Sequence, residues 1–137
     1  MDKLENYSNR GYSIVETEMV YYSPDMDKTV KWFVDILGWY GNVFDRNEDN
    51  IGTYGFVSDL PQEIIYSGAV PARTIHIWQG EALERVIAFI KVRNVEKLHD
   101  YVIRHGWNKI SDIYESAASP KTCEVTTIDG SVLWFFE

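Results

Sequence analysis

The stretch Thr127-Ile-Asp-Gly-Ser-Val-Leu-Trp-Phe-Phe-Glu137 decides the fold, because it joins a tight turn to a strand. Asp129-Gly130 is a strong hairpin signal, since glycine accepts a positive φ at no steric cost. The β-branched and aromatic run after it suits a pleated surface. Alternation along the strand places Val132, Trp134 and Phe136 on one face and Leu133, Phe135 and Glu137 on the other. Because both faces are apolar, we expect a strand buried on both sides, with the chain organised around the face of Trp134.

Length and composition indicate one folded domain. The chain has 137 residues, of which 45% are hydrophobic and 25% charged, and a chain of this size buries a sizeable core. Aromatic residues make up 15% of the chain, which suits either a dense core or a stacking pocket. Cys123 is the one cysteine, so an internal disulfide is excluded. A lone cysteine in an expected strand is more often a small buried hydrophobe than a nucleophile.

The charge balance excludes some classes of partner. Asp and Glu outnumber Lys and Arg by 21 to 13, which gives a net charge of −8. Phosphate contacts need clustered basic side chains, so we expect no nucleic-acid partner, whereas a cationic or neutral small molecule suits this charge. No apolar run approaches the roughly 18 residues of a membrane span. The polar amino terminus lacks an apolar signal region, and together these features predict a cytoplasmic protein without membrane partners.

Two helices are expected. Asp25 caps the first, 26–37, whose apolar residues recur at helical spacing until Gly38. Asn94 caps the second, about 95–105. The remaining pattern predicts strands at 13–22, 39–44, 52–57, 74–79, 83–92, from 107 onward, 122–128 and 131–136.

One long connection interrupts this pattern. Residues 58–73 contain Pro61, Gly68 and Pro71, and they predict an irregular segment with one helical turn near 62–65. Connections of this length in a compact domain often cover a pocket.

The two halves of the chain repeat one order of elements: strand, helix and three strands. Gly38-Trp39 closes the first helix and Gly106-Trp107 closes the second, at nearly the same offset as the two caps. A repeat of this kind favours two modules, about 13–80 and about 81–137, after an amino-terminal extension of residues 1–12. The predicted class is α+β, with two βαβββ modules forming a cupped mixed sheet around a central cavity and the helices outside.

Three stretches carry a resemblance to a known family. Val20–Trp39, Phe89–Leu98 and Ile128–Phe136 are similar, in their order and spacing, to segments of the vicinal oxygen chelate superfamily. This superfamily includes glyoxalase I, bleomycin-resistance proteins and extradiol dioxygenases. The resemblance covers about residues 13–137. It implies a homodimer and a pocket inside the cupped sheet.

The resemblance also implies four metal-ligand positions, one on each of four strands facing the cavity. Glu18, His76, Ile87 and Trp134 occupy them here. A carboxylate and a neutral imidazole are competent ligands, but Ile87 and Trp134 cannot bind a metal. Catalytic sites generally use three protein ligands plus water. We therefore expect a degenerate metal site and no cofactor, and a divalent ion would depend on Glu18 and His76.

Apolar and aromatic cavities with a few polar groups are typical of small-molecule sites. We expect the protein to bind a small aromatic or cationic ligand, because tryptophan faces stack flat molecules and hold cations. The expected pocket residues are Glu16, Glu18, Tyr54, His76, Trp78, Ile87, Phe89, Trp134 and Phe136.

Other interpretations of these residues stay open. The two glutamates also suit a solvated strand edge, Trp134 suits plain core, and a hydrogen bond between Glu18 and His76 would satisfy both groups without a function. If that pair faces a cavity, it also suits an acid–base couple. Whether the protein is an enzyme is open: one alternative is a metal-dependent lyase, isomerase or dioxygenase using Glu18 and His76, lactoylglutathione lyase-like or dioxygenase-like. Another is a structural or interaction protein whose cavity is filled by its own aromatic side chains.

Overall fold

The computed structural model describes residues 11–137. The predicted extension, residues 1–12, lies outside the described residues except for Gly11 and Tyr12. The elements, in chain order, are β1 (Met19–Ser23), α1 (Met26–Leu37), β2 (Tyr40–Arg46), β3 (Gly52–Ser58), α2 (Gln62–Ser67), β4 (Ile75–Gln79), β5 (Val86–Lys91), α3 (Val95–Arg104), β6 (Thr122–Thr126) and β7 (Val132–Phe136).

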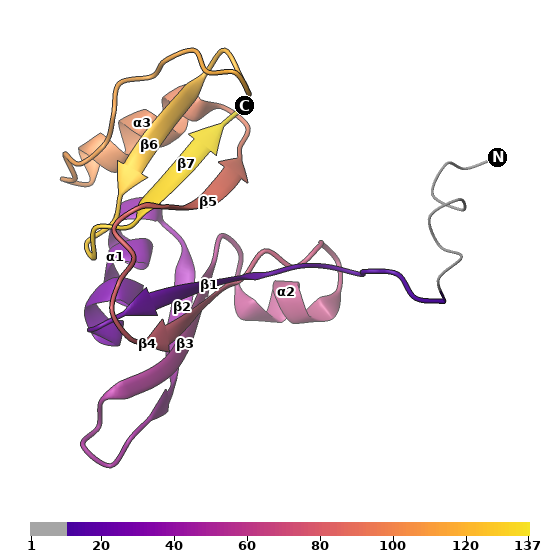
Figure 1. The fold of residues 1–137 in the computed structure, drawn as a ribbon, viewed down its shortest axis with the longest axis vertical. Coiled ribbons are helices and arrows are strands. Elements are labelled where there is room, and N and C mark those ends of the chain that lie inside the picture. The colour runs from indigo at the N-terminus through magenta and orange to yellow at the C-terminus, as the bar shows by residue number, and fades with distance from the viewer. Residues whose placement is uncertain (1–10) are drawn as a thin grey trace.

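The strands form two sheets, which lie one above the other in Figure 1. The order of the first sheet is β1-β4-β3-β2 and that of the second is β5-β7-β6. In each sheet the first strand of the module runs parallel to the last strand, and the last strand is antiparallel to the one before it in sequence. This shared topology confirms the α+β class and the two modules in one chain.

The ends of the two long helices also repeat. The side chains of Asp25 and Asn94 accept the backbone N–H groups of Lys28 and Lys97, so each caps its helix. Gly38 and Gly106 then adopt positive φ angles of 73° and 86°, which glycine tolerates without a Cβ clash. The predicted helix starts and stops are therefore confirmed, with α3 ending one residue earlier than expected.

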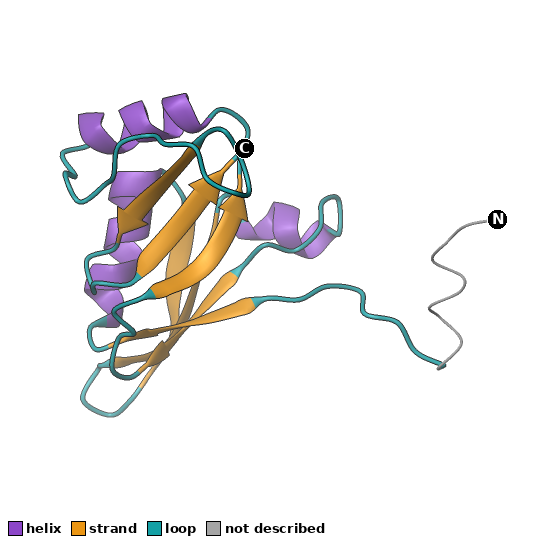
Figure 2. Ribbon diagram, turned by 45° about the horizontal axis from the view of Figure 1, so that its top comes forward, coloured by secondary structure: helices purple, strands orange, loops and turns teal. Residues whose placement is uncertain are grey.

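One apolar core joins the modules. Helices α1 and α3 contact each other and lie on the same side of the two sheets (Figure 2). The core includes Phe33 of α1, Ile77 of β4 and Leu133 of β7, all with no exposed surface. Neither α1 nor α3 therefore covers the opposite faces of the two sheets.

A buried polar cluster also links the modules. The Tyr21 hydroxyl on β1 donates to Oδ2 of Asp129 over 2.6 Å and lies 2.6 Å from the Thr127 hydroxyl, while Thr29 of α1 donates to the same Asp129 oxygen over 2.5 Å. Burial and the hydrogen bond to Asp129 raise the pKa of Tyr21. The Asp129-Gly130 turn is therefore fixed to the first module by side chains.

Two predicted strands are wrong in extent. The first begins at Met19 rather than residue 13, because its parallel partner β4 begins only at Ile75. No strand forms between residue 107 and β6, where two isolated bridges, Ile110 to Val125 and Tyr114 to Thr122, take its place. The irregular connection contains α2, which is longer than the single turn expected.

The expectation that β7 is buried on both sides is also wrong. Leu133 and Phe135 have no exposed surface, but the side chains on the face of Trp134 are partly exposed. Within residues 11–137 no helix packs on that face, because α1 and α3 lie on the other. None of the helices in this part of the chain is long and apolar enough to span a bilayer.

Candidate functional site

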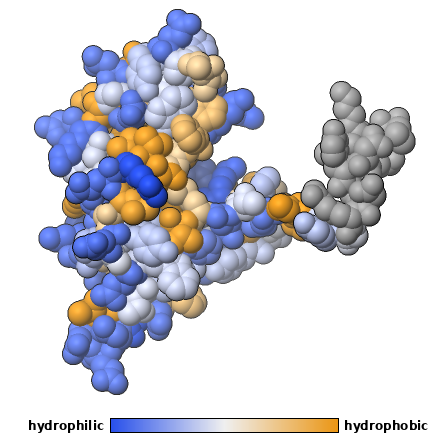
Figure 3. Space-filling view, viewed as in Figure 1, coloured by the Kyte–Doolittle hydropathy of each residue, from blue (hydrophilic) through white to orange (hydrophobic). Residues whose placement is uncertain are grey.

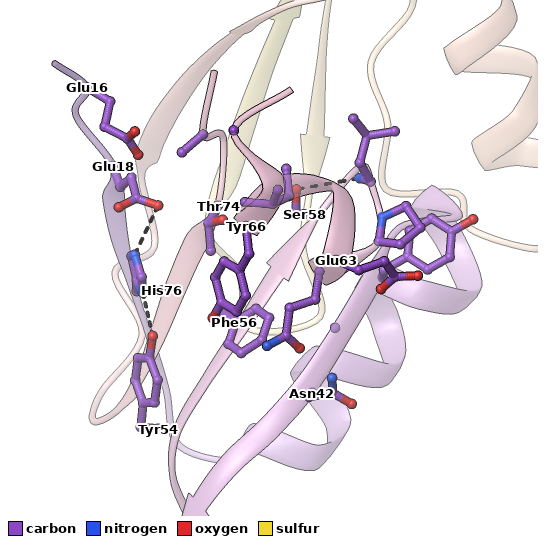
Figure 4. A pocket seen from close by; sticks show the side chains of 18 residues that line it. Glu16, Glu18, Asn42, Tyr54, Phe56, Ser58, Glu63, Tyr66, Thr74 and His76 are labelled. Atoms are coloured by element: carbon purple, nitrogen blue, oxygen red, sulfur yellow. Dashed lines mark hydrogen bonds and ion pairs between the residues drawn. The ribbon is translucent and has the colours of Figure 1, made fainter. Parts of the chain in front are cut away.

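His76 lies at the centre of a line of three polar side chains on the face of the first sheet opposite α1 (Figure 4). It sits on β4 between Phe56 of β3 and Val20 of β1, and Glu18 lies in the segment that leads into β1. The Tyr54 hydroxyl of β3 is 2.6 Å from Nδ1 of His76, and Oε1 of Glu18 is 3.3 Å from Nε2. Register explains the line, because Tyr54 is opposite Trp78 and Phe56 is opposite His76, which puts these alternating residues on one face.

The partners of His76 fix the positions of its protons. A carboxylate only accepts hydrogen bonds, so the position of Glu18 favours the tautomer of His76 that carries its hydrogen on Nε2. In the neutral ring Nδ1 then accepts, and the Tyr54 hydroxyl donates to it. Each ring nitrogen of His76 therefore lies close to a protein group, Tyr54 at Nδ1 and Glu18 at Nε2.

Tyr54 is held in its protonated form. Burial raises the pKa of the Tyr54 phenol, and the neighbouring Tyr66 and Glu18 raise it further. The same ring stacks on the imidazole of His76, with centroids 5.9 Å apart and planes 19° from parallel. A neutral Tyr54 that donates its hydroxyl hydrogen to Nδ1 can still accept a hydrogen bond on its oxygen, so it offers an acceptor and an aromatic ring.

The line forms one wall of a cavity of about 700 Å³, which we call the sheet cavity. Its other walls come from β2 and from the connection that includes α2. Three carboxylates, Glu16, Glu18 and Glu63, line it, but no Lys or Arg does among residues 11–137. The aromatic residues that line it are Tyr40, Tyr54, Phe56 and Tyr66.

The second sheet carries a separate aromatic cluster. The rings of Phe89 and Trp134 meet edge to face with centroids 5.1 Å apart, and Phe136 lies 5.7 Å from Trp134. The indole N–H of Trp134 donates to the Tyr114 hydroxyl over 3.1 Å. Phe89 is 71% exposed, and Figure 3 shows apolar side chains on the surface over β5.

The nine residues expected in one pocket are therefore split. Glu16, Glu18, Tyr54 and His76 line the sheet cavity. Trp78 lies beside it, 52% exposed, with its ring 6.1 Å from that of Tyr54. The other four belong to the second sheet, and none of them lines the sheet cavity: Ile87, Phe89, Trp134 and Phe136.

The residues at the four implied ligand positions do not fit a metal ion. Glu18 and His76 are adjacent, but the other two positions carry apolar side chains on the other sheet. No group of three His, Cys, Asp or Glu residues suited to an ion exists in the described part of the chain. Cys123 is buried, and burial raises the pKa of its thiol to about 11, so it supplies no thiolate near neutral pH.

Sequence reasoning missed the part of the cavity that α2 supplies. Glu63 and Tyr66 lie one helical turn apart and both line the cavity. The helix has six residues between Pro61 and Gly68, which is too short for a periodic pattern to stand out. The spacing of Glu63 and Tyr66, one helical turn apart, was the sequence signal that could have identified this wall of the cavity.

Known proteins share the sequence pattern and the fold of this chain. The sequence pattern of the bleomycin resistance protein domain matches residues 18–80. The crystal structure of a glyoxalase-related enzyme from Clostridium phytofermentans is 44% identical, with a TM-score of 0.85, over 93% of this chain and 98% of that one. No protein with a curated description matches the chain.

More distant structures share the fold. A bleomycin-binding protein from Streptomyces verticillus, complexed with copper(II)-bleomycin, has a TM-score of 0.67 at 17% identity, over 91% of this chain and 97% of that one. A bleomycin resistance determinant encoded on the transposon Tn5 has a TM-score of 0.66 at 10% identity, over 89% and 96%. At these identities the likeness concerns the fold alone.

Proposed function

The chain belongs to the glyoxalase/bleomycin-resistance family of the vicinal oxygen chelate superfamily, and from that premise we propose that its sheet cavity binds a small aromatic cation. The observation that carries the proposal is the lining of the cavity. Carboxylates and aromatic faces share it, and no Lys or Arg lines it within residues 11–137.

The physical basis is charge and stacking in the same space. A cation over an aromatic face gains about 0.5–2 kcal/mol, more when it is desolvated. Glu16 and Glu63 have no ion-pair partner among the described residues, so a bound cation would supply one. A volume of about 700 Å³ lies within the range of small-molecule sites, which argues against a cavity filled by its own side chains. The copper(II)-bleomycin complex of a relative shows that this fold accommodates a small-molecule ligand.

A homodimer would complete this site. The aromatic cluster of the second sheet is exposed in one chain, and large exposed apolar clusters commonly mark interfaces. A second copy that placed its Phe89 and Trp134 over the sheet cavity would reunite the residues expected in one pocket. Analytical ultracentrifugation tests this: we expect a dimer, and Phe89→Asp should yield monomers with weaker cation binding. A monomeric native protein would refute the dimer and leave the sheet cavity as a site within one chain.

The second candidate function is enzymatic proton transfer. The line Tyr54–His76–Glu18 favours it, because a neutral imidazole between a phenol and a carboxylate can move a proton along the line. The similarity to a glyoxalase-related enzyme supports it as well. Calorimetric titration with zinc, nickel, manganese and ferrous ions separates this metal-free chemistry from metal-dependent lyase, isomerase or dioxygenase chemistry. Micromolar binding that disappears in His76→Ala would return the protein to the metal-dependent branch.

Calorimetry with N-methylquinolinium and neutral quinoline tests the proposed function. We expect the cation to bind with a dissociation constant on the order of 100 µM or tighter, and quinoline about tenfold more weakly. Glu16→Gln/Glu63→Gln should weaken the cation about tenfold, because it removes two nearby charges. Glu48→Gln/Glu115→Gln changes the net charge equally on exposed positions outside the cavity and is the matched control. Equal affinity for the two ligands would refute the proposal.

A further inference from the structure

A second cavity, of about 930 Å³, lies where the two modules meet. We call it the junction cavity. Its apolar walls come from both modules: Trp39 and Ile75 belong to the first, and Leu98, Tyr101 and Phe135 to the second. It shares only Glu18, Ala72 and Thr74 with the sheet cavity. Apart from Phe89, which also belongs to the exposed aromatic cluster of the second sheet, its apolar walls lie outside the site described above.

The charge of the junction cavity is opposite to that of the sheet cavity. Arg73, Lys91, Arg93 and Lys97 line it, in a chain whose net charge is −8. Its two carboxylates are already engaged, since Asp59 pairs with Arg73 over 2.7 Å and Glu18 faces His76. Positive charge is therefore left in excess at this cavity.

Three of these cations have no carboxylate partner. Six Lys and Arg side chains of the described chain form ion pairs with Asp or Glu. Lys91, Arg93 and Lys97 form none among residues 11–137, although all three line the same cavity. Acidic side chains outnumber basic ones here, so the missing partners are not explained by a shortage of carboxylates.

The backbone gathers these three side chains within one short reversal. Lys91 ends β5, Arg93 lies in the connection, and Lys97 lies in the first turn of α3. Asn94 takes φ 68° and ψ 71° at the reversal, and its side chain accepts the backbone N–H of Lys97 over 3.1 Å. The left-handed residue and its hydrogen bond hold the strand end and the helix start together, so the three cations stay on one wall.

We propose that the junction cavity binds a small amphipathic organic anion, a carboxylate on an aromatic or aliphatic body. The carboxylate meets Lys91, Arg93 and Lys97, and the apolar body lies against Trp39, Leu98 and Tyr101. Charged hydrogen bonds of this kind are stronger than neutral ones and are weakened by salt when they are exposed. The proposal does not depend on cation binding in the sheet cavity, because the charged residues that carry it are different.

Calorimetry of the full-length protein with 2-naphthoate tests the proposal, with neutral 2-naphthalenemethanol as the uncharged counterpart. We expect 2-naphthoate to bind, and to bind at least about tenfold more weakly to Lys91→Gln/Arg93→Gln/Lys97→Gln. The alcohol should bind both proteins equally. Lys28→Gln/Lys31→Gln/Lys109→Gln removes the same charge on exposed positions outside the cavity and should bind 2-naphthoate like the native chain.

A second readout locates the contact. Trp39 and Tyr101 signals should shift in NMR spectra on addition of 2-naphthoate, and those shifts should shrink in about 0.5 M salt because exposed charges are then screened. The proposal is overturned if neither ligand binds at millimolar concentration, if the native chain does not prefer the carboxylate, or if both triple variants lose affinity equally. These outcomes are independent of N-methylquinolinium binding, so failure of one cavity does not conceal failure of the other.

Discussion

The Tyr54 hydroxyl lies 2.6 Å from Nδ1 of His76, and the opposite nitrogen of the same ring lies 3.3 Å from Glu18. This relation places a protein group close to each nitrogen of the one histidine at the implied ligand positions. It also leaves a phenol and a carboxylate beside an aromatic cavity. Such a site is suited to hold an organic cation or to move a proton. It is poorly suited to coordinate a metal ion.

The carboxylate of Glu18 should fix the tautomer of His76. Nitrogen-15 NMR of the native protein at about pH 8, where an ordinary histidine is neutral, should show the hydrogen on Nε2. Glu18→Ala should give a mixture of tautomers, because the Tyr54 hydroxyl can donate or accept. Tyr54→Phe should keep the hydrogen on Nε2 and lower the free energy of unfolding by about 1 kcal/mol. Hydrogen on Nδ1 in the native protein would contradict the assignment.

The turn at Asp129 should contribute to stability through its side chain. Asp129→Ala leaves the hydroxyls of Tyr21 and Thr29 without their shared acceptor. We expect the free energy of unfolding to fall by about 2–3 kcal/mol, because buried donors lose a charged partner. Urea titration measures this. The control Asp112→Ala, at an exposed position, should change the value by less than about 0.5 kcal/mol. Equal effects would show that the cluster does not join the modules.

Stability should fall at alkaline pH through Tyr21. Burial and Asp129 raise the pKa of this phenol above that of an unfolded tyrosine, about 10, so only the unfolded chain releases the proton as the pH passes that value. This contribution is complete below about pH 10 and is lost above it, at up to about 1.4 kcal/mol per pH unit. Urea titrations between about pH 9 and 11.5 should show a steeper decline for the native protein than for Tyr21→Phe. Parallel declines would contradict the shift.

The end of α1 should tolerate no side chain at Gly38. An alanine there would strain a left-handed residue, and its Cβ would collide with the Tyr101 hydroxyl. Gly68 has a similar φ of 76° but open space around it, so Gly68→Ala isolates the backbone strain. We expect that control to cost about 1–2 kcal/mol and Gly38→Ala at least about 1 kcal/mol more, measured by urea unfolding. Equal costs would mean that Tyr101 moves aside freely.

Local chemistry explains why parts of the fold could be predicted from sequence. Asp25, Gly38 and Asn94 act within a few residues of themselves, so their caps and stops follow from residue type. The expected proximity of Glu18 and His76 came from the family resemblance, which places both at ligand positions facing one cavity. The helix caps and stops depended on no distant contact.

The remaining differences depend on partners elsewhere in the chain. The pattern of residues 13–18 suits a strand, but β4 provides pairing only from Ile75. The hydroxyl of Ser111 accepts a hydrogen bond from the backbone N–H of Glu124. The two isolated bridges on either side of Ser111 differ by one residue in register. The strand expected from residue 107 therefore does not form. The face of β7 that carries Trp134 was predicted to be buried because its side chains are aromatic. Within residues 11–137 no helix covers that face.

The most direct test of the central claim is a crystal structure of the protein with N-methylquinolinium. We predict the ring in the sheet cavity, with its charged nitrogen within about 6 Å of the Tyr54 or Tyr66 ring centroid and near Glu63. A ligand bound only outside this cavity would contradict the claim. A divalent ion held by Glu18 and His76, with the cation displaced, would replace it with a metal-dependent function.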